Sequence, residues 1–94
     1  MFEKLSPQRV RNTAGFVVQV ADRETVEYIQ GSRIARITVD FAPLTGVYED
    51  TLTDWLADGA VQPMSPQDRV RVLKDIGEGL AFMGIRFEWC RVNP

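Results

Sequence analysis

A strong helix signal near the carboxyl end constrains what this chain can fold into. Ser65, Pro66 and Asp68 are typical of a helix start, because serine caps free backbone amides and proline is tolerated at the first helical position. Apolar residues then recur with helical spacing as far as Gly84, and glycine readily ends a helix. The sequence therefore predicts one long amphipathic helix that begins at Pro66 and ends near Gly84.

The remaining segments alternate apolar with polar residues, a period that is typical of β-strands. Gly31–Ser32 is a hairpin signal, because glycine accepts the backbone angles of a tight turn. Pro43 ends one strand, and residues 58–63 interrupt the pattern. The fourth run is irregular and predicts either a kinked strand or a strand followed by a loop. The predicted runs are 16–21, 25–29, 33–41, 47–56 and 85–90.

These elements predict an α+β domain in the order β-β-β-β-α-β. An antiparallel sheet of four to five strands would carry the long helix on one face, and its other face would be exposed to solvent. The length of 94 residues fits a single domain, residues 1–94. Residues 1–13 combine charges, a proline and few apolar side chains, so we expect an amino-terminal arm anchored by Phe2 and Leu5.

The chain lacks the residues on which most catalytic and metal sites depend. It has no histidine and a single cysteine, Cys90, which excludes Ser–His and Cys–His pairs, His-ligated metals and Cys-rich zinc modules. The carboxylates of residues 49–58 do not have the spacing of an EF-hand loop, and no glycine-rich phosphate loop is present. We therefore expect no catalytic, cofactor-binding or metal-binding residue, and no enzyme activity.

The net charge of −2 hides an uneven distribution. Residues 37–68 contain six acids and no base, whereas residues 1–36 (six bases, four acids) and 69–94 (five bases, three acids) are each mildly basic. The acidic segment is either a set of solvated turns or a surface that attracts basic partners and repels nucleic acid. The sequence has neither the apolar run of a signal peptide nor that of a membrane span, so we expect a cytoplasmic protein that binds neither nucleic acid nor membrane.

Two aromatic residues make the acidic segment a candidate contact surface. Trp55 and Tyr48 lie among acids, and aromatic side chains are favoured anchors at interfaces. The alternative for Trp55 is a place at one end of the core. Trp89 alternates with the apolar residues of the last strand and is expected in the core, whereas Phe82 lies either under the arm or at a contact surface. The predicted partner-binding residues are Tyr48, Glu49, Asp50, Asp54, Trp55 and Asp58.

The carboxyl-terminal half carries a pattern of spaced residues. Trp55, Pro63 and the helix start Met64–Arg69 precede the apolar positions and the closing Gly84–Ile85. The apolar positions are Leu73, Ile76 and Leu80–Ala81–Phe82. Residues 47–90 thereby resemble a small group of immunity proteins from bacterial polymorphic toxin systems. That resemblance implies a non-enzymatic protein that binds and blocks a toxin domain made by the same cell.

The sequence thus predicts a small interaction protein whose acidic segment meets a basic surface on a cognate protein. Two alternatives stay open. One is a homo-oligomeric domain, such as a homodimer, whose open sheet face or edge pairs with itself. The other is a small ligand-binding protein or enzyme.

Overall fold

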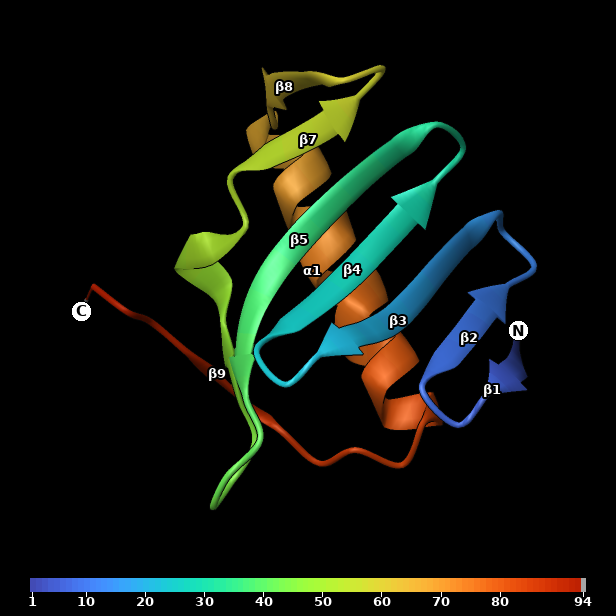
Figure 1. The fold of residues 1–94 in the computed structure, drawn as a ribbon, viewed down its shortest axis with the longest axis vertical. Coiled ribbons are helices and arrows are strands. Elements are labelled where there is room, and N and C mark those ends of the chain that lie inside the picture. The colour runs from blue at the N-terminus through green and yellow to red at the C-terminus, as the bar shows by residue number, and fades with distance from the viewer. Residues whose placement is uncertain (94) are drawn as a thin grey trace.

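One helix packs against one face of a mostly antiparallel sheet in the computed structural model, which describes residues 1–93 (Figure 1). The α+β class and the single helix are as predicted. The strands are β1 (Phe2–Ser6), β2 (Arg9–Asn12), β3 (Phe16–Asp22), β4 (Thr25–Gln30), β5 (Arg33–Asp40), β6 (Gly46–Tyr48), β7 (Asp54–Ala57), β8 (Ala60–Pro63) and β9 (Glu88–Cys90). The helices are the 3-10 turn η1 (Glu49–Thr51) and α1 (Pro66–Phe82).

The sheet is a meander that divides in two beyond β5. Strands β1 to β5 pair antiparallel with their neighbours in chain order. The residues Thr38–Asp40 of β5 then pair with β6, whereas Arg33–Ala35 pair with β7. Strand β8 extends the β7 branch, and β9 extends the β6 branch as the one parallel partner within residues 1–93. The long strand β5 therefore carries both branches on one side (Figure 1).

The number and order of strands differ from the prediction. The sheet has nine strands rather than four to five. Residues 1–13 are not an arm, because β1 and β2 form a hairpin that joins the sheet through β3. Within that hairpin Val10 is fully buried against the core, which gives the short β2 a packing role that its polar neighbours conceal.

The segment between β5 and α1 also contains more strand than predicted. The irregular run 47–56 is divided between β6, η1 and β7. Residues 58–63 form a turn and β8 instead of a break, because Asp58 and Gly59 adopt φ angles of 51° and 75°. Positive φ at both central residues is what a two-residue hairpin requires. The last strand is shorter than the predicted 85–90 and covers only Glu88–Cys90.

The helix begins and ends where the sequence predicts. The Ser65 hydroxyl accepts a hydrogen bond of 3.1 Å from the Asp68 amide, which caps the first turn. At the other end Gly84 has a φ of 83°, and the Ile85 amide donates to the Leu80 carbonyl over 3.0 Å. This is the closing motif that a glycine after a helix permits. No helix among residues 1–93 is long and apolar enough to span a membrane.

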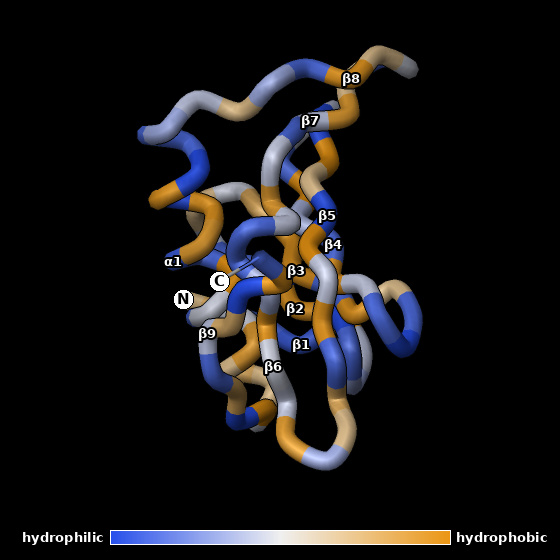
Figure 2. The backbone as a smooth tube through the Cα atoms, turned by 90° about the vertical axis from the view of Figure 1, so that its left-hand side faces the viewer, coloured by the Kyte–Doolittle hydropathy of each residue, from blue (hydrophilic) through white to orange (hydrophobic). Residues whose placement is uncertain are grey.

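The core lies between the sheet and α1, which Figure 2 shows as two layers seen edge-on. It joins side chains of β2 to β7 to Val72, Ile76 and Leu80 of α1. Trp89 is not part of this buried set: its ring lies over Gly77, and 42% of the residue is exposed, so its predicted core position is wrong. Phe82 stacks on Phe2 of β1, with 5.5 Å between ring centroids, but stays 42% exposed.

Candidate functional site

The six residues predicted to bind a partner do not form one cluster. Glu49 and Asp50 lie in η1, where they hold the carboxyl-terminal segment. Glu49 pairs with Arg91 at 3.0 Å. The carboxylate of Asp50 accepts hydrogen bonds of 2.9 Å from the amides of Val92 and Asn93, and these bonds lower its pKa. These two acids are therefore occupied within the chain.

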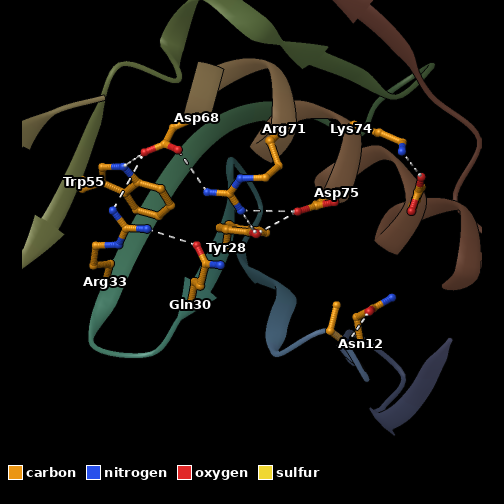
Figure 3. Close-up of polar contacts among 11 residues, drawn as sticks. Asn12, Tyr28, Gln30, Arg33, Trp55, Asp68, Arg71, Lys74 and Asp75 are labelled. Carbon is orange, nitrogen blue, oxygen red and sulfur yellow. Dashed lines mark hydrogen bonds and ion pairs between the residues drawn. The ribbon is translucent and has the colours of Figure 1, made fainter. Parts of the chain in front are cut away.

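Trp55 is a core residue, as the alternative for it allowed. It is only 2% exposed, and its ring packs beside Tyr28 with 6.0 Å between centroids. The Arg33 guanidinium lies 4.0 Å from the centre of the indole, and the indole Nε1 donates to Asp68 of α1 over 3.3 Å (Figure 3). A side chain held in this way cannot act as an exposed anchor for a partner.

A polar network continues from Trp55 along α1 (Figure 3). The buried Tyr28 hydroxyl donates to Asp75 over 2.8 Å and accepts from Arg71 over 3.2 Å. Burial and the Asp75 carboxylate raise the pKa of Tyr28. Arg71 also donates to Asp68 over 3.3 Å, which lowers the pKa of that carboxyl. These bonds tie α1 to β4 and β7, so we assign the network to the stability of the fold.

Tyr48, Asp54 and Asp58 remain at the surface. Asp54 and Asp58 are exposed, at the start of β7 and in the turn after it. Tyr48 is half-buried on the sheet face opposite the core, since its neighbour Val47 is buried. Tyr48 pairs with Thr38 of β5 and Ala57 with Arg33, so the two ends of the segment lie about 17 Å apart along β5. The predicted acidic cluster is therefore dispersed.

One face of the sheet is turned away from α1 and toward the viewer in Figure 1. The strand registers give this face a row of apolar residues. The strand registers place Val17, Ile29, Ile34, Leu56 and Val61 side by side on β3, β4, β5, β7 and β8. The first four are half-buried, and Val61 is 69% exposed. We call this set the outer row.

A polar row of Gln19, Glu27 and Arg36 lies beside the outer row, and its side chains bond to one another. Glu27 of β4 accepts a hydrogen bond of 2.7 Å from Gln19 and one of 2.9 Å from Arg36. These bonds lower the pKa of Glu27. Arg11 pairs in the same way with Glu3 near the β1 edge. Arg11 and Arg36 on this face are thus each compensated by a neighbouring carboxylate.

The outer row ends in a groove between β5, β7 and β8. The groove measures about 270 Å³. Three residues of the outer row line it, namely Ile34, Leu56 and Val61, together with Trp55 and the exposed acid Asp54. Sequence reasoning placed Asp54 in a contact surface but missed the apolar side chains beside it. Their signal was present in the strands, where Val17, Ile29 and Ile34 alternate out of phase with the buried residues.

The other candidate features show no reactive arrangement. Cys90 is half-buried on β9, and its sulfur lies close to Gly46. Within residues 1–93 no three carboxylate or thiol side chains are grouped closely enough to hold a metal ion. Comparisons with protein families, with characterised proteins and with solved structures found no match.

Proposed function

We propose that this chain is a non-enzymatic protein-binding domain whose partner covers the outer row. The resemblance of residues 47–90 to immunity proteins supplies the partner class, a toxin domain with a basic surface. The proposal keeps Tyr48, Asp54 and Asp58 in the contact surface. It replaces Glu49, Asp50 and Trp55 with Ile34, Leu56 and Val61.

The outer row is the observation that carries this proposal. It runs without interruption across five strands, on a face that α1 does not cover. Contiguous apolar side chains on the surface of a small protein are typical of an interaction site. The polar row of Gln19, Glu27 and Arg36 borders this apolar centre on one side, and interfaces likewise combine an apolar centre with a polar rim.

Charge favours a basic partner at the β7–β8 end of this face. Asp54 and Asp58 are exposed there, and the base in the groove, Arg36, is paired with Glu27. Exposed acids around an apolar centre steer a basic protein toward it and speed association. The acidic middle segment thus acts through these two side chains rather than through a six-residue cluster.

Two valines of equal exposure allow a matched test. Val61 in the groove and Val70 on α1 are each 69% exposed, so each substitution to lysine disturbs the fold little. If the neighbouring gene encodes a toxin-like protein, that protein is titrated with both variants in a calorimeter. We expect V61K to weaken binding at least about tenfold, because it adds a positive charge at an apolar contact facing a basic surface, and V70K to leave affinity unchanged. Equal affinity of both variants contradicts the proposed surface, and a gene without a toxin-like neighbour contradicts the immunity assignment.

The same outer row also supports the homo-oligomeric alternative, in which two copies stack their open faces. Sedimentation equilibrium separates the two functions. A monomer at several hundred micromolar excludes self-association as the role of the face. If the natural chain is a dimer, and V61K dissociates it whereas V70K does not, the partner of the outer row is a second copy of this chain rather than a different protein.

A further inference from the structure

A second surface feature lies where the carboxyl-terminal ends of β3 and β5 meet the segment after α1. It consists of two adjoining hollows of about 370 Å³ and about 580 Å³. Both are lined by Asp22, Arg23 and Phe41, so they form one continuous groove. The outer row and the residues of the proposed contact surface take no part in its lining.

The smaller hollow has an apolar wall. Val20 follows the buried part of β3, Phe41 follows β5, and Ile85 follows the end of α1. All three are half-buried and pack against the core, so the hollow opens onto the end of the apolar interior. Its volume lies within the range of small-molecule pockets, about 300–1,000 Å³. An apolar ligand body placed here would remove this wall from water.

The larger hollow has an acidic wall. Asp22, Glu24 and Asp40 line it together with a single base, Arg23. Backbone amides orient two of the carboxylates: the Glu24 amide donates to Asp22 over 2.8 Å, and the Ala42 amide donates to Asp40 over 3.2 Å. Each of these bonds uses the Oδ1 atom and leaves Oδ2 available. Three carboxylates against one guanidinium give the groove a negative field, which favours a cationic ligand.

Phe41 links the two hollows. Phe41 belongs to the lining of both, and an aromatic face attracts a cation that lies within about 6 Å of its centre. A ligand with an apolar body beside Val20 and Ile85 and a positive group near Asp40 would contact Phe41 along its length. The apolar wall followed by the acidic wall therefore matches an amphipathic amine, which has an apolar body followed by a positive group.

We propose that this groove is a binding site for a small amphipathic organic cation. The apolar body occupies the hollow of Val20, Phe41 and Ile85, and the ammonium group lies among the carboxylates of Asp22, Glu24 and Asp40. This site is independent of the proposed protein contact, so the two proposals can fail separately.

Titration of the full chain with three six-carbon probes tests the ligand class. Amide chemical shifts are recorded against hexylammonium, hexanol and hexanoate. We expect saturable shifts at Arg23, Phe41 and Ile85 with hexylammonium, weaker ones with hexanol and the weakest with hexanoate. Shifts that do not saturate, or hexanoate binding at least as tight as hexylammonium, would overturn the proposal.

Single charge changes test the site itself by the sign of their effects. Asp40→Asn keeps the side-chain oxygen that accepts from Ala42 but removes a negative charge, and we expect it to weaken hexylammonium binding about three- to tenfold. Arg23→Gln removes the one base and should strengthen binding. Asp58→Asn makes the same charge change in the distant β7–β8 turn and should have no effect. Weakening by Asp58→Asn as large as that by Asp40→Asn, or weakening by Arg23→Gln, contradicts a site in this groove.

Discussion

Gly79 marks a close approach of α1 to the sheet. The residue is buried, and a Cβ atom placed on it would lie 2.8 Å from the Cβ of Val18 on β3. The Cβ of Val18 is fixed to its backbone, so the contact cannot be relieved by rotating a side chain. The glycine therefore sets the distance between the two layers.

Replacing Gly79 with alanine should destabilise the protein. The forced contact costs about 2 kcal/mol, the middle of the usual range for overpacking, and this exceeds the roughly 1 kcal/mol that alanine gains over glycine inside a helix. Gly77→Ala is the control, because its new Cβ meets ring atoms of Trp89 and Phe87 at 3.2 and 3.3 Å, and the exposed Trp89 ring can shift. Urea unfolding measures both variants. A Gly79→Ala protein as stable as the Gly77→Ala protein would contradict this account.

The two tryptophans show why residue environments were hard to predict. Trp55 was placed among acids, yet its register opposite Ala35 of β5 puts the ring on the core side. Trp89 has the alternation of a buried strand, but β9 is a short strand at the edge of the sheet, and the ring lies over Gly77 with one side open. The alternation of apolar and polar residues predicts which face of a strand a side chain lies on. It does not predict how deeply that side chain is buried.

Elements fixed by local chemistry were predicted well, and those fixed by distant pairing were not. The start of α1 depends on Ser65 and Pro66, and its end depends on Gly84, all of which lie in the sequence beside the helix they bound. Strand β1 is exposed along almost its whole length, so it has little apolar pattern and exists because β2 pairs with it. The backbone hydrogen bonds of such a strand leave no trace in its side chains.

The backbone of Val92 and Asn93 after β9 is held by Asp50 of η1, whereas Arg91 pairs with the neighbouring Glu49. The Asp50 carboxylate accepts hydrogen bonds from the amides of Val92 and Asn93. It thereby takes the place of the backbone carbonyls that a neighbouring strand would offer to these amides. The negative charge of the carboxylate strengthens both hydrogen bonds. The order of this segment therefore depends on the ionisation of Asp50.

Asp50→Ala should release the backbone of Val92 and Asn93. We expect the Val92 and Asn93 amides to exchange with solvent at least about tenfold faster, measured by nuclear magnetic resonance, because both lose their acceptor. Because the pKa of Asp50 is lowered below its ordinary 3.8, protection should be complete above that value and lost as the pH falls beneath it. The exposed Asp54→Ala is the control, and unchanged exchange in Asp50→Ala would refute the role of this carboxylate.

At the scale of the whole molecule, the outer row is a product of register. Each of its residues comes from a different strand, and only the pairing of β3, β4, β5, β7 and β8 aligns them. The sequence predicted that one face of the sheet would be open. It could not show that the apolar residues on this face form one continuous row, because a shift of one residue in any pair would break it.

Strand β1 is the outer strand at one side of the sheet, and β8 is the outer strand of the β7 branch. Both free edges carry features that oppose pairing with another sheet. A register shift near Leu5 and the charge of Lys4 interrupt β1. Strand β8 ends in Pro63, which pairs with Asp54. In this hairpin the Met64 amide donates to Thr53, so residues 60, 62 and 64 face β7, and the amide position of residue 63 faces the free edge. Proline therefore removes an outward donor at this position.

Pro63→Thr should make the chain associate with itself. Threonine restores the outward N–H, favours strand structure and extends the free edge next to the exposed Val61. We expect sedimentation velocity to show a monomer for the natural sequence and a concentration-dependent dimer or larger species for Pro63→Thr. Pro7→Thr, in the exposed turn between β1 and β2, is the control and should remain monomeric. A monomeric Pro63→Thr protein would show that this proline does not guard the edge, and association of both variants would point to a general loss of solubility instead.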